Sequence, residues 1–359
     1  IQVVMNEPKS MTANFGREVS VTVQTSYQGL TYSVEGETYN SQQTFNWLAG
    51  EEYSLYVESK YQTKGESGAR YMFSRWSENE TGRIYQLTAP FEDTTVTAEF
   101  VTQYYLDAET DYGSVVGEGW YDEGEEVTIT ISSMNYAVTD SSRKRFQGWS
   151  GDVSSSEGEL SIPSMFQPLS VTAEWKDQYY FRMVSDYGSL DGAGWYDVGS
   201  VISFSIADTV VSVADGVREK FTGWQGDKTS SSYQDTVHLY SPKSVKAAWK
   251  RQFRLKPSSQ GNGSVSIEPE GEVVSGIPGE YWYDSGGDVT VTATPADEFK
   301  QWTGSGVSGS ENPKTLTMSY PFTATANFND FVLYTVEGIA DNIPFKVDGE
   351  EYYTPHSFA

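Results

Sequence analysis

The side chains that could carry acid–base or nucleophilic chemistry are few and poorly grouped. The 359-residue chain has two histidines, His238 and His356, and no cysteine. His238 stands in the strand-like stretch DTVHLY without an accompanying Ser–Asp arrangement, and the sequence has no phosphate-binding loop, dinucleotide fingerprint or HExxH motif. Paired carboxylates are abundant, but they carry no information in a chain with 50 acidic residues. The sequence therefore predicts a protein that is not an enzyme and holds no cofactor.

Acidic clusters are the next candidates, because Ca²⁺ takes oxygen ligands. The stretch YDEGEE at 121–126 is such a cluster, but none has the D-x-D-x-D-G spacing of a calcium loop. Diffuse binding of Ca²⁺ or another divalent cation between neighbouring molecules is favoured over a defined site. The sequons at Asn79 and Asn262 stand in loop-like sequence and are candidates for N-glycosylation.

The charge balance limits the partners. With 24 basic and 50 acidic residues the formal charge is −26, so nucleic acid and anionic lipid are poor partners, and none is expected. No apolar run approaches the roughly 18–20 residues that a membrane span needs, and we expect no membrane insertion of this segment. The lack of cysteine is compatible with an extracellular microbial protein.

Two aromatic motifs recur along the chain. A Phe-x-x-Trp motif before a small polar turn occurs four times, at Phe73/Trp76, Phe146/Trp149, Phe221/Trp224 and Phe299/Trp302. A Trp-Tyr-Asp-x-Gly motif occurs three times, at Trp120, Tyr121, Asp122 and Gly124, at Trp195, Tyr196, Asp197 and Gly199, and at Trp282, Tyr283, Asp284 and Gly286.

For each motif a structural interpretation competes with a binding one. Phe-x-x-Trp is interpreted as core filling, against an aromatic platform for sugars. Trp-Tyr-Asp-x-Gly is interpreted as a turn before a strand, in which Asp bonds nearby backbone N–H groups and Gly takes a positive φ. Its alternatives are sugar binding and an aromatic contact to the next module.

Self-similarity divides the chain into modules. The segment QYYLDAETDYGS at Gln103 returns as QYYFRMVSDYGS at Gln178, and a divergent copy begins at Gln252. The predicted parts are a closing strand of a preceding module (1–15), module 1 (16–102), module 2 (103–177), module 3 (178–251), module 4 (252–329) and the start of a further module (330–359). Residues 1–46 align without gaps to 314–359, so we expect a slice of a longer array that repeats in blocks of four; exchange of strands between chains is the alternative.

The predicted fold class is all-β, a tandem array of small β-grasp-like or sandwich-like modules. Segments such as VSVTVQT and EEVTITIS alternate apolar and polar residues, as half-buried strands do. Only the stretch VVSVADGVREK at 210–220 could hold a single helical turn. The stretches KDQ (176–178) and KRQ (250–252) are expected to be short linkers that hold neighbouring modules at fixed angles.

The stretch DVTVTATPADEFKQWTGSGVSGSENPKTLTMSYPFTATANF at 288–328 closely resembles the divergent internalin-type B repeat, a Listeria–Bacteroides-like repeat. Modules 2 and 3 resemble the longer form found in archaeal surface proteins. The resemblance covers about residues 16–329, although FSRWSEN in module 1 lacks the glycines of the pattern. It implies β-rich modules of secreted, S-layer-like cell-surface proteins and implies no activity.

The sequence thus predicts a structural protein of the cell exterior that builds a surface layer, sheath or extracellular filament. Its expected partners are other copies of itself in a homopolymer or lattice, and cell-wall or surface glycans. The alternative is an adhesin stalk or a carbohydrate- or cell-binding module of a large surface protein.

Overall fold

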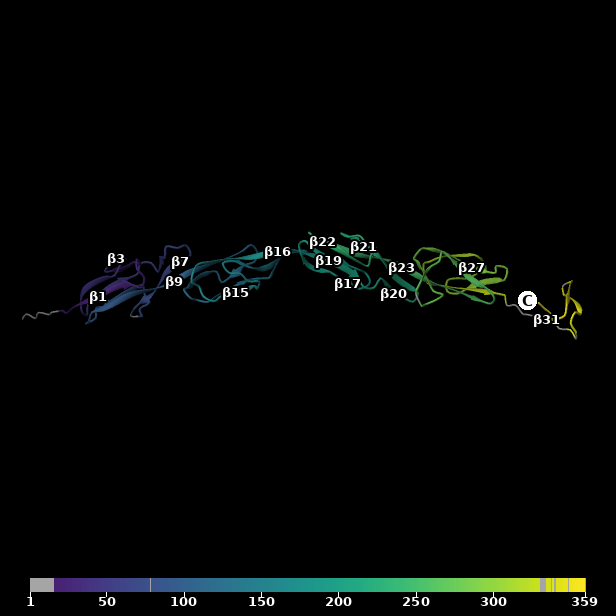
Figure 1. The fold of residues 1–359 in the computed structure, drawn as a ribbon, viewed down its shortest axis with the longest axis horizontal. Coiled ribbons are helices and arrows are strands. Elements are labelled where there is room, and N and C mark those ends of the chain that lie inside the picture. The colour runs from purple at the N-terminus through teal and green to yellow at the C-terminus, as the bar shows by residue number, and fades with distance from the viewer. Residues whose placement is uncertain are drawn as a thin grey trace, which may run out of the picture. The chain divides into compact units, whose positions relative to one another are not determined.

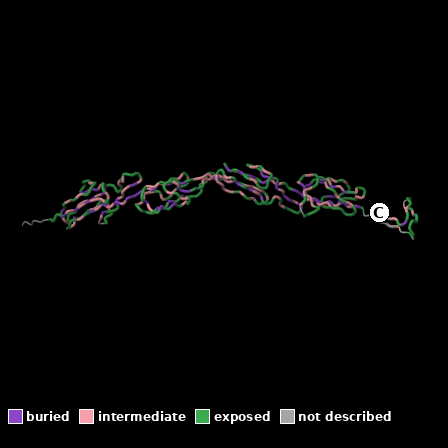
Figure 2. Tube along the Cα trace, in the orientation of Figure 1, coloured by how far each residue is buried: buried purple, intermediate pink, exposed green. Residues whose placement is uncertain are grey.

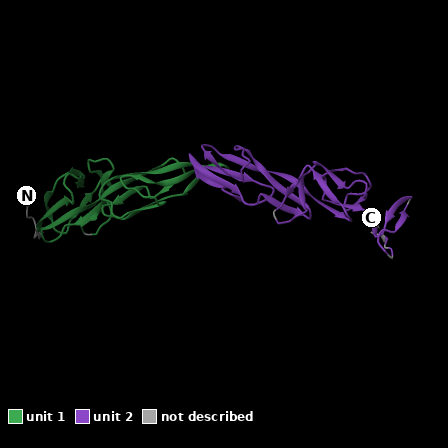
Figure 3. Ribbon diagram, turned by 45° about the vertical axis from the view of Figure 1, so that its right-hand side comes forward, with its two compact units in different colours: residues 1–178 green, residues 179–359 purple. Residues whose placement is uncertain are grey.

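The protein is β-structure throughout the residues that the computed structural model describes, which are 16–359 except 78, 275, 330–333, 337, 339, 348 and 359. The described residues contain strands and no helix, so the all-β prediction is confirmed. A β-grasp needs a helix on its sheet, and the sandwich alternative therefore describes these residues. The closing strand expected at 1–15 lies outside the described residues. The chain divides into two compact units, residues 1–178 and 179–359 (Figure 3).

Unit 1 contains the strands of modules 1 and 2. Its strands are β1 (Glu18–Thr25), β2 (Tyr32–Val34), β3 (Glu37–Tyr39), β4 (Gln43–Leu48), β5 (Glu52–Tyr56), β6 (Tyr61–Thr63), β7 (Ala69–Trp76), β8 (Ile84–Thr88), β9 (Thr94–Thr110), β10 (Val115–Val116), β11 (Gly119–Asp122), β12 (Val127–Ile131), β13 (Asn135–Thr139), β14 (Ser142–Gly151), β15 (Glu159–Ile162) and β16 (Leu169–Val184), the last of which ends in unit 2.

Unit 2 contains the remaining strands. They are β17 (Leu190–Asp191), β18 (Gly194–Asp197), β19 (Ser200–Ile206), β20 (Val210–Ala214), β21 (Val217–Gly226), β22 (Gln234–Leu239), β23 (Lys243–Gln260), β24 (Ser264–Glu268), β25 (Glu272–Val273), β26 (Tyr281–Asp284), β27 (Asp288–Thr294), β28 (Phe299–Thr303), β29 (Lys314–Thr317), β30 (Phe322–Phe328), β31 (Tyr334–Val336), β32 (Pro344–Val347), β33 (Glu350–Tyr353) and β34 (His356–Phe358).

Each module is a two-layer sandwich of a small and a large sheet. The small sheets have the strand orders β3-β2-β5-β8, β10-β12-β15, β17-β19-β22 and β24-β27-β29. The large sheets are built around the long strands: β9, for example, pairs with β7 (antiparallel) and β1 (parallel) in its first part, and with β11 (antiparallel) and β16 (parallel) in its second.

Strand alternation explains how the two layers share a core. In β12 the side chains of Val127, Ile129 and Ile131 are buried while Thr128 and Thr130 are exposed, because successive residues of a strand face opposite sides. The described residues form four clusters of buried apolar side chains, two in each unit. Figure 2 marks the buried residues in purple along the chain. The module boundaries inferred from the repeats stay a prediction.

The stretch at 210–220 is a hairpin, and the helical turn considered for it is wrong. Strands β20 and β21 flank a two-residue turn, Asp215–Gly216, in which Gly216 has a φ of +69°. An Asp-Gly pair between two apolar runs favours a β-hairpin, and this stretch forms one.

The expected linkers are also wrong. The stretches 176–178 and 250–252 lie inside strands β16 and β23. In unit 2, β23 pairs with β21 from Gly226↔Val245 to Val217↔Phe253, and already from Gln252↔Asp284 it pairs with β26 of the next module. Figure 1 shows β23 running from the strands of module 3 into those of module 4. One continuous strand thus closes one module and opens the next.

Candidate functional site at the module junctions

The Phe-x-x-Trp side chains lie in the cores. Phe299 is half-buried against the core of module 4, and the other seven are buried. The Phe and Trp rings of each motif lie edge to face or tilted, with centroids 5.2–5.8 Å apart. The seven buried side chains are those of Phe73, Trp76, Phe146, Trp149, Phe221, Trp224 and Trp302.

A β-bulge explains the spacing of this motif. Residues three apart in a regular strand face opposite sides of the sheet, yet both aromatic rings face inward. The strand register shifts between Phe73 and Arg75, between Phe221 and Gly223, and between Phe299 and Gln301. The extra residue turns the Trp back to the face of the Phe.

Trp149 and Trp302 fill the cores as predicted, and their backbones have a second role that Trp224 shares. Each lies inside a strand, β14 or β28, and its indole is only 3% or 0% exposed. The backbone N–H of Trp149 donates to the carbonyl of Ser155 at 2.7 Å, and that of Trp302 donates to the carbonyl of Gly309 at 2.8 Å. Each tryptophan therefore also closes the polar loop that follows it.

The indole N–H groups of these tryptophans differ between modules. Trp302 Nε1 donates to the carbonyl of Glu311 at 2.9 Å, and Trp76 Nε1 donates to that of Gly82 at 3.1 Å. In the described part of the chain, the buried Nε1 atoms of Trp149 and Trp224 have no hydrogen-bond partner. A buried polar group left unpaired costs about 1–3 kcal/mol, so burial of Trp149 and Trp224 stabilises the core less than burial of a tryptophan with a paired N–H.

The Trp-Tyr-Asp-x-Gly residues form a short strand before the turn. Trp120 and Tyr121 lie in β11, and the chain turns only after Asp122, with Gly124 at a φ of +83°. Gly199 and Gly286 have φ values of +83° and +82°. The glycine part of the expectation matches the structure, whereas the aromatic residues belong to a strand.

The tyrosine of the motif binds its own module. Tyr121 Oη donates to the carbonyl of Gly117 at 2.6 Å, Tyr196 Oη to Gly192 at 2.9 Å, and Tyr283 Oη to Pro269 at 2.9 Å. Burial raises the pKa of Tyr283 to about 12.

The aspartate of the motif does not serve mainly as a local turn cap. Asp122 Oδ1 accepts a hydrogen bond from Gln103 Nε2 at 2.9 Å, and Asp284 Oδ1 accepts the equivalent bond from Gln252 Nε2, also at 2.9 Å. Gln103 and Gln252 are buried, and each lies in the middle of the long strand that joins two modules. The motif therefore contacts the joining strand.

An arginine of the preceding module completes the set. Arg70 Nε donates to Gln103 Oε1 at 2.8 Å, and Arg218 Nε donates to Gln252 Oε1 at 2.8 Å. At the end of unit 1, Arg143 Nε makes the same bond to Gln178 Oε1 at 2.8 Å. The Arg–Gln–Asp relay seen within each unit is called the junction clamp below.

The tryptophan of the motif packs on the arginine. The Cζ atom of Arg70 lies 4.0 Å from the ring centroid of Trp120 and 3.8 Å from that of Tyr61, and Arg218 Cζ lies 4.4 Å from that of Trp282. Burial lowers the pKa of both guanidinium groups, which nevertheless keep their charge at neutral pH. Cation–π contacts contribute about 0.5–1 kcal/mol at exposed sites and about 2 kcal/mol or more when desolvated.

The clamp in unit 2 carries additional charges. Arg218 Nη2 lies 3.2 Å from Glu272 Oε2, Lys220 Nζ lies 2.7 Å from the same atom, and Lys250 Nζ lies 2.6 Å from Asp284 Oδ2. Burial opposes ionisation of both carboxylates. Hydrogen bonds from Lys220 and Gln252 outweigh it for Glu272, and those from Lys250 and Gln252 outweigh it for Asp284, so that both pKa values lie below their ordinary range.

The tips of two hairpins also contact the following module at these junctions. The β6–β7 tip places Gly68 against Pro168 of module 2, and the β20–β21 tip places Gly216 against Pro321 of module 4; a Cβ on either glycine would lie 2.9 or 2.7 Å from the proline Cβ. The carbonyl of Gly68 accepts from Tyr105 N–H at 2.8 Å, and that of Gly216 from Arg254 N–H at 3.0 Å.

Side chains beside these tips enter the core of the following module. Ala69 is a buried member of the module 2 cluster, and Val217 packs against the module 4 cluster. At both junctions the connection is thus made by a strand, a clamp and a hairpin together.

Sequence reasoning missed the arginine. It stands three residues before the Phe of the motif in modules 1 to 3, as Arg70, Arg143 and Arg218, and module 4 has Ala296 there. The recurring Arg-x-x-Phe-x-x-Trp spacing was available as a signal, and so was the Gln that begins modules 2 to 4.

The remaining candidate residues do not assemble a second site. Asn79 and Asn262 are exposed in loops, and Asn79 has a φ of +64°. The ring of His238, on the exposed face of β22, stacks with that of Tyr240 just after the strand, with centroids 6.2 Å apart. In the described part of the chain, no group of three or more His, Asp or Glu side chains could hold a metal ion. The described residues include no helix long and apolar enough to span a membrane.

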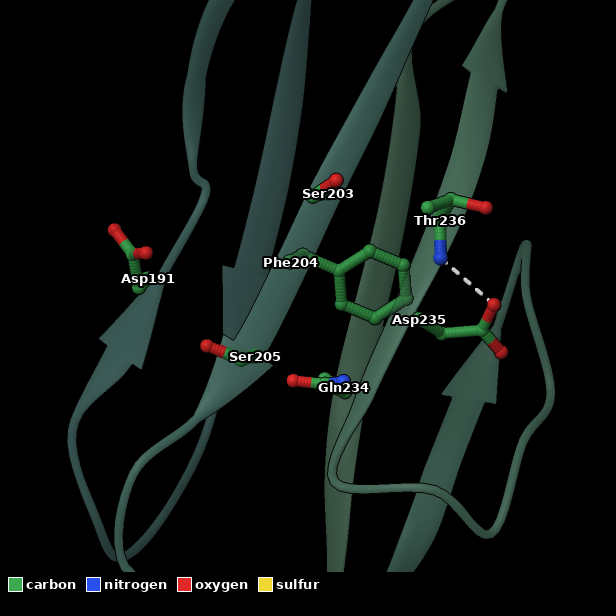
Figure 4. Close-up of a pocket in the computed structure, with 7 residues that line it drawn as sticks. All are labelled: Asp191, Ser203, Phe204, Ser205, Gln234, Asp235 and Thr236. Carbon is green, nitrogen blue, oxygen red and sulfur yellow. Dashed lines mark hydrogen bonds between the residues drawn. The ribbon is translucent and has the colours of Figure 1, made fainter.

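The hollow in Figure 4 is a polar surface feature of module 3. Ser203, Ser205 and Thr236 line it on β19 and β22, while the ring of Phe204 belongs to the core. Asp235 Oδ1 accepts from the N–H of Thr236 at 2.7 Å, and this bond, with help from Ser230 and Lys228, lowers the pKa of Asp235. That carboxylate orders its own loop.

The fold and the junctions define a tandem β-sandwich repeat protein. Residues 106–178 and 256–331 match the family model of the divergent InlB B-repeat domain, which confirms the resemblance over these two stretches. They lie mainly in modules 2 and 4.

No curated protein matches the chain significantly. Among solved structures, the crystal structure of a variant of BcpA, the major pilin subunit of Bacillus cereus, matches with 10% identity, 87% coverage of this chain, 100% coverage of that chain and a TM-score of 0.17. This similarity is too low to support an inference.

Proposed function

We propose that this chain is a non-enzymatic structural protein of the cell exterior, in which β modules are joined as stiff segments of a surface layer, sheath or extracellular filament. The observation that carries the proposal is the module junction. A continuous strand, an Arg–Gln–Asp relay around a buried glutamine and a hairpin that packs on the next module resist bending and twisting between modules. An enzyme or a flexible tether has no need for such a connection.

The B-repeat match supports the same function by family resemblance. The resemblance implies modules of secreted cell-surface proteins, and we extend that location to this chain. The acidic surface, with a formal charge of −26, suits a protein that must stay soluble until it is assembled.

The carbohydrate-binding alternative has less support. A sugar platform needs an open aromatic face, but Trp120 carries the guanidinium of Arg70 on its ring, and Trp282 is 9% exposed beneath Arg218. These tryptophans serve the connection between modules.

Immunogold electron microscopy of the native cells tests the proposal. An antibody raised against the purified chain should label the outer surface or material extending from it, in a continuous or filamentous pattern. Pre-immune serum and antibody adsorbed with the purified chain are the controls. Label confined to the cell interior would refute the proposed function.

A further inference from the structure

Among the strands of the large sheets that have an unpaired outer edge, β13 and β20 stand at equivalent places in modules 2 and 3. In the described part of the chain, β13 pairs with β14 and β20 pairs with β21, and neither strand has a partner on its other side. Both are exposed: Val138 is 53% and Val213 is 41% accessible. An edge strand presents a row of free N–H and C=O groups that can pair with another chain.

These two edges lack the usual protection against pairing. The sequences NYAVT of β13 and VVSVA of β20 contain no charged residue and no proline, in a chain with 24 basic and 50 acidic residues. The equivalent strand of module 1, β6, is three residues long and lies between Lys60 and Lys64. Short edges and flanking lysines are devices that prevent edge pairing.

Module 4, whose residues 288–303 are all described, has no such strand, because β27 leads to β28 through a short loop. At this hairpin position the edge strand is therefore uncharged in modules 2 and 3, short and flanked by lysines in module 1, and absent from module 4. This contrast argues that β13 and β20 are used.

The distribution of charge indicates which chain can pair with these edges. Two copies of a chain with a charge of −26 repel each other over most of their surfaces. An uncharged strand adds no like charges at the contact itself, so the repulsion between two copies is smallest where such strands meet. Antiparallel pairing of a strand with itself is self-complementary, as a two-fold symmetric contact requires. A basic partner, in contrast, would find no carboxylate within either strand.

We propose that β20, together with β13 at the equivalent place in module 2, is the docking edge through which a second copy of this chain adds an antiparallel strand to the large sheet. The inference rests on the proposed structural function, since it names the partner of the array. In this arrangement two copies contact each other through main-chain hydrogen bonds, and the side chains of Val213 and Val138 lie beside those bonds.

Sedimentation equilibrium of the full 359-residue chain tests the proposal, at low and high NaCl over a range of concentrations. The unmodified chain should self-associate, and more strongly at high salt because salt screens its negative charge. The double variant Val138→Lys/Val213→Lys should weaken association at least about tenfold, because it places like charges across each pairing.

The double variant Val116→Lys/Val201→Lys is the matched control. It adds the same two lysines at exposed valines of modules 2 and 3 outside the hairpins, 69% and 56% accessible, and should associate like the unmodified chain. Circular dichroism melting should show that all three proteins are folded. Hydrogen exchange of 210–214 should slow as concentration rises.

The inference is overturned if the unmodified chain stays monomeric at all concentrations and salts, if both double variants weaken association equally, or if exchange at 210–214 is independent of concentration. A monomeric chain that labels the cell surface would remove this inference and leave the proposed function. Edge pairing of a chain that is labelled only inside the cell would refute the proposed function and leave this inference.

Discussion

Position 223, directly before Trp224 in the bulge, needs a residue without a side chain. Gly223 has a φ of +146°, and a Cβ built on it would lie 2.5 Å from the carbonyl oxygen of Ser230. Gly148 in module 2 is in the same situation, with a φ of +145° and the carbonyl oxygen of Ser155 at 2.5 Å. The glycine therefore permits the two backbone segments to approach each other closely at the bulge.

Replacing Gly223 by Ala should destabilise unit 2 by about 1–3 kcal/mol, the cost of a strained backbone position, because the chain must shift away from Ser230. Urea unfolding followed by tryptophan fluorescence measures this change. Gln301→Ala is the matched control, since module 4 already carries a side chain at the bulge. An unfolding free energy unchanged in Gly223→Ala would show that the backbone approach is not needed.

The residues of the site were predictable to different degrees. Recurrence and hydrophobicity favour burial of the Phe-x-x-Trp aromatics, since a small module loses about 3–5 kcal/mol without a buried Trp. They do not reveal that Trp149 closes a loop through its backbone, because that bond involves no side chain. The role of Asp122 was not predictable either, because its partner Gln103 also binds Arg70, and hydrogen bonds between three strands leave no local pattern.

At the scale of elements, the joining strand decides the connection between modules. Period-two alternation correctly indicated strands such as β12 and β19. It failed at Lys250–Gln252, where polar residues suggested a linker. These residues continue β23 because their backbone pairs with β21 and then with β26. Backbone pairing does not require apolar side chains, so polar residues that contact other polar groups can occupy such a strand.

Acidification should loosen the unit 2 junction first. Folding lowers the pKa of Glu272 and of Asp284, so their contribution to stability is full above the ordinary carboxyl range, about pH 4, and is lost as pH falls through the lowered values. Hydrogen exchange, with rates corrected for the intrinsic effect of pH, should show earlier loss of protection in β26 than in β27.

The variant Glu272→Gln provides the control for that experiment, because it removes one of the two titrating groups and should shrink the acid-dependent change. Equal loss of protection in β26 and β27 over the same pH range would contradict a specific role of these carboxylates.

At the scale of the whole molecule, the modules within each unit are held together by their connections instead of forming one large domain. Modules of about 75 residues bury limited apolar surface, and contacts between neighbours supply more. Ala69 and Val217 show this directly, since each side chain packs in the core of the module that follows its own. Repetition in the sequence predicted such dependence between neighbours, but the hairpin that provides it was visible only in the structure.

A distance measurement within unit 2 tests the central claim that the junctions are rigid. The chain has no cysteine, so spin labels can be placed uniquely at Ser203→Cys in module 3 and Thr315→Cys in module 4, both exposed. Double electron–electron resonance should give one narrow distance distribution. Arg218→Ala, which removes the arginine of the clamp, should broaden this distribution, while Lys246→Ala at an exposed ion pair should not. A distribution that is already broad in the protein with Arg218 intact would contradict the account.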